Sequence, residues 1–326
     1  MTVSFIIVAY NEEATIQRLL EDIKGQDYPH EKIEILLIDG NSTDKTKEIM
    51  YRFAEESTDF KQVTVLDNPK RTLPCGWNIA LEAAQADVIL RVDAHASVPL
   101  DFISKNIQCL ETGEKICGGY RPNVIDEETP WKKTLLLAEK SMFGSSIAPY
   151  RRNGKRCYVK SVFHGAYCRE VFVKIGKYNE QLKRTEDNEI HYRMRKAGYK
   201  ICFDPSIVSY QHIRNTLKTM LKQKYLNGYW VGKTAKICPK CLSIYHFVPG
   251  LFIIGIFVTS LLAMLHIWEP CLMMWGCYWG LAVIMALAAI LQEKKFFGNY
   301  SVLPALFFLL HISYGLGTLK GLLCRN

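Results

Sequence analysis

The first part of the chain alternates short apolar runs with segments in which apolar residues recur at helical spacing. Apolar runs bounded by polar residues predict buried strands at Val3–Ala9, Ile33–Ile38, Val63–Leu66 and Val88–Val92. In the segments between these strands, apolar residues recur three and four positions apart, which predicts helices at Ala14–Lys24, Lys45–Ala54 and Gly76–Ala84. Alternation of this kind is typical of a mostly parallel sheet with helices on both faces. The pattern therefore predicts an α/β fold with a Rossmann-like central sheet.

The last quarter of the chain has a different pattern. Tyr245–Leu265, Leu272–Leu291 and Ser301–Leu319 contain no Asp, Glu, Lys or Arg and hold 21, 20 and 19 residues. About 20 apolar residues cross the hydrocarbon core of a bilayer. We therefore expect about three transmembrane helices. Three buried core helices are the alternative, but a chain of 326 residues offers little protein to bury them.

Charge suggests how such an anchor would be oriented. The chain has a formal net charge of +9, and Arg214 to Lys240 holds seven Lys or Arg and no acid. Within it, Thr216–Ile237 has the spacing of an amphipathic helix, so we expect a basic helix at a surface of anionic lipid on the cytoplasmic side. No nucleic-acid motif accompanies the charge, and we expect no nucleic-acid partner. Met1–Tyr10 lacks the basic start of a signal peptide. These features predict a multi-pass protein of the cell membrane with its large domain in the cytoplasm.

Three parts follow from these patterns: a globular α/β domain over 1–213, a basic amphipathic helix and linker over 214–243, and a membrane anchor over 244–326. The eleven Cys follow no disulfide framework and are expected to be thiols. Cys238 and Cys241 form a lone CxxC, for which zinc binding or redox chemistry is a less favoured interpretation.

Polar residues follow each predicted strand. Three of these segments open with an acid, at Asp39, Asp67 and Asp93, and the first begins with Tyr10 followed by Asn11. Sheets of this type bind their ligands at the carboxyl ends of the strands. The functional site is therefore expected at this edge.

The sequence resembles a known family at four places. FIIVAYNEEATIQRLLEDI, ILLIDGNSTDKT, RVDAHA and TEDNEIHYRMRKAGY stand in the order seen in family 2 glycosyltransferases of the GT-A fold. The resemblance covers residues 1–235, and RVDAHA makes the chain similar to the succinoglycan-type glucosyltransferases of exopolysaccharide synthesis. It implies inverting transfer of a sugar from a UDP-sugar to a saccharide acceptor carried on a lipid, in the synthesis of exopolysaccharide, capsule or another cell-surface glycan.

The resemblance assigns residues to the donor. Asp39 would bind the uracil or ribose, with Glu12 beside it; a helix cap is the alternative for Asp39. Asp93 and His95 take the place of an Asp-x-Asp motif that holds a divalent cation, Mn²⁺ or Mg²⁺, on the diphosphate. Imidazole suits a transition ion better than Mg²⁺, so His95 leaves the metal open. Arg71 would approach the phosphates or lie in solvent.

Other residues are assigned to catalysis and to the acceptor. Asp187 would be the general base, supported by Glu186, although both also suit the first turn of a helix. His164 would lie in a loop around the acceptor. Trp230 would stack on a sugar or sit among interfacial aromatic residues. Arg91, two residues before Asp93, would touch phosphate or pair with an acid.

Three other functions fit parts of the sequence. A polyprenyl-phosphate sugar transferase would share the fold and the anchor and would load the lipid carrier directly. A processive synthase is disfavoured, because no Arg precedes Trp230 as the synthase motif requires. A membrane sugar-binding or scaffold protein with a decayed site is the alternative that is not an enzyme, and the presence of Asp39, Asp93 and Asp187 argues against it.

Overall fold

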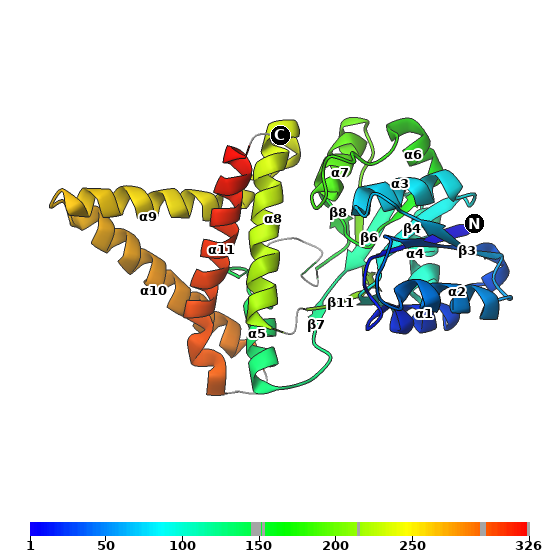
Figure 1. Ribbon diagram of the computed structural model, residues 1–326, viewed down its shortest axis with the longest axis horizontal. Helices are drawn as coiled ribbons and strands as arrows, with labels where there is room; N and C mark the ends of the chain where they lie inside the picture. The colour runs from blue at the N-terminus through cyan, green and yellow to red at the C-terminus, as the bar shows by residue number, and fades with distance from the viewer. Residues whose placement is uncertain (145–150, 152–153, 214–215, 294–297, 325–326) are drawn as a thin grey trace. The chain divides into compact units, whose positions relative to one another are not determined.

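The computed structural model describes residues 1–144, 151, 154–213, 216–293 and 298–324 (Figure 1). The described chain forms two compact units. The first comprises Met1–Pro122 and Pro149–His212, and the second comprises Asn123–Ala148 and Ile213–Asn326. All eleven Cys are free thiols.

The first unit is built on an eight-stranded sheet of order β3-β2-β1-β4-β9-β6-β10-β8. Its strands are β1 (Val3–Ala9), β2 (Ile33–Asp39), β3 (Gln62–Asp67), β4 (Val88–Asp93), β6 (Ile116–Tyr120), β8 (Cys157–Tyr158), β9 (Ala166–Cys168) and β10 (Cys202–Val208). Strands β1 to β4 are parallel, and β9 runs antiparallel between β4 and β6. A short strand, β5 (Ala96–Ser97), pairs antiparallel with β11 (Tyr210–His212) outside this sheet. The predicted mostly parallel sheet is confirmed.

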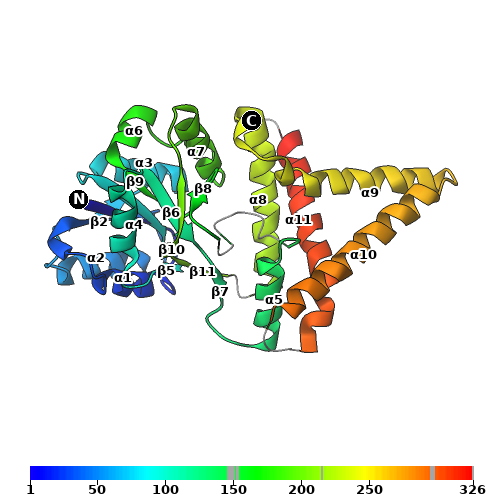
Figure 2. The same cartoon turned by 180° about the vertical axis from the view of Figure 1, so that it is seen from behind.

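Helices cover both faces of the sheet (Figures 1 and 2). One face carries α1 (Ile16–Lys24) and α2 (Thr46–Glu56), and the other carries α3 (Leu73–Ala83), α6 (Arg169–Ile175) and α7 (Glu186–Lys196). Helix α4 (Phe102–Glu111) packs against β6 and β10, and a short 3₁₀ turn, η1 (His30–Lys32), precedes β2. Helix α1 buries the four residues expected from its spacing, Ile16, Leu19, Leu20 and Ile23.

A buried polar contact joins β1 to β2. All seven residues of each strand are buried, including Ser4 and Glu34, which are register partners. The Ser4 hydroxyl donates to Oε2 of Glu34 at 2.5 Å, and the same carboxylate accepts from the backbone N–H of Gln85 at 3.0 Å. The N–H of Ala86 donates to Ser4 Oγ at 3.2 Å. The polar atoms are thus hydrogen-bonded where burial would otherwise be costly.

The second unit is helical. Besides β7 (Asn123–Val124) it contains α5 (Pro130–Lys140), α8 (Leu217–Ile237), α9 (Val248–Met264), α10 (Glu269–Leu291) and α11 (Leu303–Leu323), with 3₁₀ turns η3 (Pro239–Cys241), η4 (Ile244–His246) and η5 (Gly298–Val302). Leu135 and Ala138 of α5 share an apolar cluster with Leu306 and Phe307 of α11. This packing explains why Asn123–Ala148 groups with the C-terminal helices, whereas the sequence analysis placed it in the 1–213 domain.

Glycines bring α8 and α11 into close contact. A Cβ on Gly228 would lie 2.0 Å from the backbone oxygen of Tyr314, and one on Gly321 would lie 2.1 Å from that of Tyr229. Helix backbones approach this closely only where small residues face each other. The predicted helix over Thr216–Ile237 is therefore present, with Thr216 as its N-cap, but one of its faces is covered by α11.

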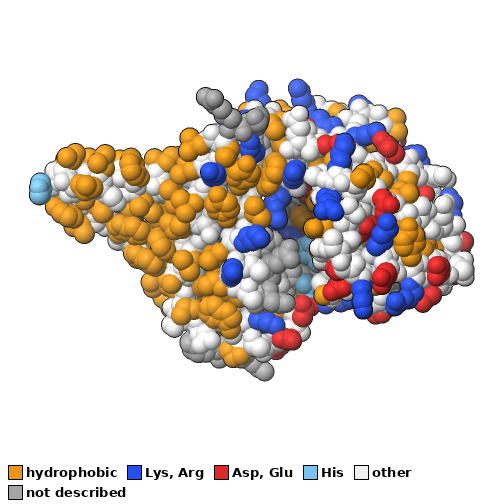
Figure 3. Space-filling view, in the orientation of Figure 1, with side chains coloured by type: hydrophobic (Ala, Val, Ile, Leu, Met, Phe, Trp, Pro, Cys, Tyr) orange, Lys and Arg blue, Asp and Glu red, His pale blue; other side chains and the backbone are white. Residues whose placement is uncertain are grey.

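Two helices, Glu269–Leu291 and Asn299–Leu323, are long and apolar enough to cross a membrane by length and composition. Helix α9, which contains most of the first predicted span, has only 17 residues. Apolar side chains cover the visible surface of the α9–α10 hairpin (Figure 3). Together these features indicate membrane association.

Candidate active site

The parallel strands bring two acidic residues to one edge of the sheet. Asp39 ends β2 beside Ala9, and Asp93 ends β4 beside Val8, so the two acids flank the end of β1. Asp39 is fully buried and accepts hydrogen bonds from the backbone N–H of Ser42 at 3.3 and 3.2 Å. Asp39 does not cap α2, because Asp44 accepts from the N–H of Thr46 at the start of that helix. The carboxylate instead stabilises the turn at the strand end.

Glu12 reaches the residue that replaces the second acid of the motif. Its Oε1 lies 3.4 Å from Nδ1 of His95, and its Oε2 accepts from the Thr15 hydroxyl at 2.7 Å. The neighbouring Glu13 does not point into this group, since it accepts from the N–H of Lys45 at 3.0 Å. The structure thus brings Glu12 to His95.

His164 faces Asp93 from a different part of the chain. Its Nδ1 lies 2.8 Å from Ser209 Oγ, and its Nε2 lies 3.8 Å from Oδ2 of Asp93, beyond hydrogen-bond distance. Nε2 is buried and has no hydrogen-bond partner among the described residues. Burial lowers the pKa of His164. Burial opposes ionisation of Asp93, but His164, His95 and Arg91 outweigh it and hold the pKa of this carboxyl well below its usual range.

Arg91 pairs with an acid, which resolves the alternative left open by the sequence. Its guanidinium is buried and forms an ion pair with Asp187 and a 2.8 Å hydrogen bond to the Tyr178 hydroxyl. It lies over the rings of Trp77 and Tyr178, at 4.7 and 5.5 Å from their centroids. Burial alone would lower the pKa of Arg91, but Asp187 raises it well above the usual value. A fixed positive charge therefore lies beside Asp187.

Glu186 and Asp187 open α7 and differ in environment. Glu186 is 2% exposed, and its Oε2 has no hydrogen-bond partner within the described ranges. Burial, reinforced by the adjacent Asp187 carboxylate, raises the pKa of Glu186 to about 8. Asp187 keeps 15% of its side chain exposed and pairs with Arg91. Of the two, Asp187 is therefore the better proton acceptor.

His191 is a residue that sequence reasoning missed. It lies one helical turn after Asp187 and is fully buried. Its Nε2 lies 2.8 Å from the Tyr167 hydroxyl and its Nδ1 2.9 Å from that of Ser161. Burial lowers the pKa of His191 to about 4, so the ring is neutral. The two contacts tie α7 to β9 and to the segment before it.

Other predicted residues are not joined to this cluster. Arg71 is exposed and has a positive φ of 57°. Its neighbour Lys70 pairs with Glu180 at 2.6 Å. Trp230 belongs to α8 in the second unit, where its ring meets Tyr229 edge to face at 5.8 Å. The predicted roles of Arg71 and Trp230 stay predictions.

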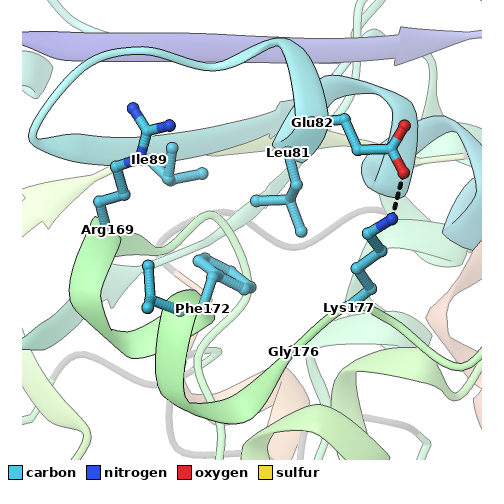
Figure 4. Close-up of a pocket in the computed structure, with 8 residues that line it drawn as sticks. Leu81, Glu82, Ile89, Arg169, Phe172, Gly176 and Lys177 are labelled. Atoms are coloured by element: carbon cyan, nitrogen blue, oxygen red, sulfur yellow. Dashed lines mark hydrogen bonds and ion pairs between the residues drawn. The ribbon is translucent and has the colours of Figure 1, made fainter.

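A cavity of about 200 Å³ lies elsewhere in the first unit (Figure 4). Leu81, Ile89 and Phe172 line it, and Lys177 donates to Glu82 at its edge. Ile89 stands near the beginning of β4, whereas Asp93 stands at its end. The cavity is therefore separate from the acidic cluster.

Comparison with known proteins identifies the class. Residues 4–176, more than half of the chain, match the family model "Glycosyl transferase family 2". The chain belongs to glycosyl transferase family 2 and is a glycosyltransferase that uses a nucleotide-sugar donor.

Two curated relatives are similar over most of the chain. A dolichyl N-acetyl-α-D-glucosaminyl phosphate 3-β-D-2,3-diacetamido-2,3-dideoxy-β-D-glucuronosyltransferase from Methanococcus voltae is 28% identical over 99% of this chain and 98% of its own length. The succinoglycan biosynthesis protein ExoA of Rhizobium meliloti is 28% identical over 70% of this chain and 68% of its own. The predicted resemblance to the succinoglycan type is confirmed.

One solved structure supports the fold over nearly the whole chain. A mannosyltransferase from Pyrobaculum calidifontis, solved in complex with GDP-mannose and Mn²⁺, aligns with a TM-score of 0.60 at 19% identity and covers 97% of this chain and 86% of its own. The predicted GT-A fold is confirmed. Transferases of this fold commonly use a divalent metal.

The residues at the end of β4 fit a cation that is bound partly by its substrate. Among the described residues, no three His, Cys, Asp or Glu side chains form a cluster that could hold a metal ion. Asp93 nevertheless presents a carboxylate of lowered pKa, with the partnerless Nε2 of His164 beside it. Mg²⁺ and similar ions are often held by one or two carboxylates together with substrate phosphates. Asp93 with His95 or His164 would suit such a site.

Replacing Glu186 with glutamine is expected to make stability less dependent on pH. Folding raises the pKa of Glu186 from 4.5 to about 8. The folded state therefore holds this proton more tightly than the unfolded state, and the stability that this contributes is complete below pH 4.5 and is lost as the pH rises through 8. One pKa unit corresponds to about 1.4 kcal/mol, so the variant should be more stable than the parent by a few kcal/mol at pH 8. The thermal unfolding midpoints of parent and variant at pH 5 and pH 8 measure this effect. If the two proteins differed by the same amount at both pH values, the raised pKa of Glu186 would be contradicted.

Proposed function

We propose that the chain transfers one sugar, with inversion, from a UDP-sugar to a lipid-linked saccharide acceptor. The main support for this proposal is the contact between the end of β4 and the start of α7. Arg91 and Asp93 stand two residues apart on one strand, and Arg91 holds Asp187 in an ion pair. The candidate diphosphate site and the candidate base therefore share one support.

On the donor side, Asp39 accepts from the nucleotide and Asp93 stands at the diphosphate. A buried carboxylate that already accepts from Ser42 keeps lone pairs for an imide N–H or a ribose hydroxyl. A divalent cation held by Asp93 with His95 or His164 would neutralise charge on the departing diphosphate. Glu12, 3.4 Å from His95, orients that imidazole.

On the acceptor side, Asp187 removes the proton from the attacking hydroxyl. The acceptor oxygen forms a bond to the anomeric carbon while the bond from that carbon to the diphosphate breaks, and UDP leaves with the electron pair. Attack from the face opposite the leaving group inverts the configuration. Glu186 keeps its proton near neutral pH and supports the site as a neutral neighbour.

The lipid-linked acceptor follows from the anchor and from the relatives. The Methanococcus relative is named for a dolichyl-phosphate-linked acceptor, and it matches this chain from end to end. Exposed lysines of α8, such as Lys222 and Lys236, supply positive charge at a membrane surface on the cytoplasmic side. In this arrangement the anchor is multi-pass.

The experiment is UDP release by the purified full chain in detergent, with a panel of UDP-sugars and with Mn²⁺ or Mg²⁺. Asp187→Asn is expected to lower kcat by about 10²–10⁴-fold, because general-base catalysis contributes about that much. Asp93→Ala is expected to lower kcat as well, because the cation on the departing diphosphate would lose a ligand. Asp59→Asn is the matched control, since that exposed acid pairs with His30 and not with a residue of the candidate site. Transfer that requires a saccharide on the lipid supports the proposal.

Two results would contradict parts of this proposed function. Transfer to bare polyprenyl phosphate would assign the chain to the transferases that load the lipid carrier directly. Full activity in Asp187→Asn would remove this residue as the base, even if the UDP-sugar were confirmed as donor.

A further inference from the structure

Helix α8 is too charged to cross a bilayer. It carries Lys218, Lys222 and Lys224 in its first half and Lys233 and Lys236 near its end. Only Tyr225–Gly232, eight residues, separates the two groups. Eight helical residues span about 12 Å, and the hydrocarbon core is about 30 Å thick. Helix α8 therefore does not cross the hydrocarbon core of a membrane.

Helix α11 follows α8 along its length in the same direction. A Cβ on Gly317 would lie 2.1 Å from the backbone oxygen of Tyr225, and one on Gly232 would lie 2.3 Å from that of Thr318. Further on, Lys236 Nζ donates to the backbone oxygen of Cys324 at 2.7 Å. Two helices in contact over this length have to lie at the same depth, and Lys236 places the end of α11 at the polar surface.

A second charged helix covers the first half of α11. Helix α5 packs on it, and Glu139 of α5 pairs with Lys224 of α8 at 2.8 Å, with both side chains buried. His311, in the middle of α11, lies 2.6 Å from the backbone oxygen of Phe143, just after α5. Protein that includes charged and polar groups therefore covers one side of this part of α11.

Most of the large apolar residues that α11 leaves exposed form one stripe, and Leu322, which is 37% exposed, lies outside it. Val302, just before the helix, Leu309, Leu316 and Leu323 are exposed by 38%, 37%, 48% and 81% and recur every seven residues. Seven residues are close to two helical turns, so these side chains share one face. Helix α9 carries a denser set of exposed apolar residues, three or four residues apart along its length, at Leu251, Ile254, Phe257, Val258, Leu261 and Met264.

Helix α9 leaves the α8–α11 pair after its first turns. Gly315 of α11 would contact Pro249 and Ile253 if it had a Cβ, and Gly250 would contact Thr318. Beyond these turns α9 runs away from α11, and α10 returns (Figures 1 and 2). The hairpin surface is covered by apolar side chains in Figure 3.

We propose that the α9–α10 hairpin alone enters the bilayer core, and that α11 lies in the membrane interface beside α8 with its apolar stripe towards the lipid. The end of α11 is then on the same side of the membrane as α8. This inference rests on the proposed membrane anchor and replaces its third crossing with an interfacial helix.

Depth measurements in lipid vesicles test the proposal. Spin labels attached to a genetically encoded ketone amino acid avoid the eleven native thiols. They are placed singly at 302, 309, 316 and 323 of the full chain in phosphatidylcholine–phosphatidylglycerol vesicles, with Ile284 of α10 as the reference. We expect one shallow depth for the four positions, within about one helical turn of 5 Å, and a greater depth at 284.

Other depth profiles would overturn it. A crossing α11 would place 309 and 316 deeper than 302 and 323 by roughly 10 Å, since the four positions extend over about 31 Å of helix. Labels that all remain in water, including that at 284, would overturn the proposal together with the anchor on which it rests, whereas UDP-sugar activity would be unaffected.

A reporter behind Asn326 gives an independent result. Green fluorescent protein fused there should fluoresce and alkaline phosphatase should be inactive, as for the same reporters fused before Met1. Active phosphatase at the carboxyl end, with an inactive fusion at the amino end, would establish an odd number of crossings and overturn the proposal.

Discussion

Replacing Arg91 with methionine is expected to lower kcat by about 10²–10³-fold, with a smaller change in KM for the UDP-sugar. Arg91 would act as a positioning residue, because its guanidinium is held between Trp77 and Tyr178 and forms the ion pair with Asp187. Without it, Asp187 loses its partner at a site that is 15% exposed. Leaving one charge of a buried pair without its partner lowers the free energy of unfolding by about 3–5 kcal/mol. Because Asp187 is partly exposed, we expect a decrease of about 2–4 kcal/mol here.

A double-mutant cycle separates positioning from stability. Asp187→Asn in the Arg91→Met background removes the unpaired charge, so the free energy of unfolding should recover while activity stays low. Arg91→Lys keeps the charge but loses the planar group that lies over the two rings, and it should fall between the parent and Arg91→Met. If Arg91→Met kept the parent kcat and unfolded at the parent temperature, the ion pair would have no part in placing the base.

Replacing Gly228 with leucine is expected to prevent assembly of the second unit. Even the Cβ would lie 2.0 Å from the Tyr314 backbone oxygen, so α8 and α11 would have to separate. Overpacking a core costs about 1–3 kcal/mol when side chains can move, and more is expected here because the obstacle is backbone. The yield of monodisperse protein in detergent and its thermal midpoint measure the effect.

Gly280→Leu in α10 is the matched control, because a Cβ there meets nothing within 4 Å. It should leave yield and midpoint close to those of the parent. Equal loss in both variants would mean that any large residue in these helices is harmful, and the close contact would not be the cause.

Much of the first unit could be predicted from the sequence because its strands and helices are local patterns. The apolar runs gave β1 to β4, and the rule that ligands bind at strand ends placed Asp39 and Asp93 on one edge. Glu12 and His95 lie in the segments that follow β1 and β4, so the same rule predicts that both are near this edge, but not that they contact each other.

The remaining contacts join residues that are far apart in the chain, and the periodicity of apolar residues does not predict such contacts. Whether Arg91 would meet phosphate or an acid depended on how α7 packs against β4. His191 carries no signal beyond its place one turn after Asp187, and His164 gave no indication that its Nε2 faces Asp93. In the second unit, hydropathy alone could not reveal that glycines hold α11 against a lysine-rich helix.

The hydrogen bond between Ser4 and Glu34 helps to set the register of β1 and β2. Strands β1 and β2 are apolar on both faces, so a slip of one residue would bury nearly as much apolar surface as the native pairing. Such a slip would leave both polar side chains buried among apolar neighbours without a hydrogen bond. This would lower the free energy of unfolding by about 1–3 kcal/mol for each unsatisfied group. It would also shift Asp39 by about 3.3 Å relative to the end of β1. A contact at the opposite end of the strands from the catalytic edge thus selects the one alignment in which that edge is assembled.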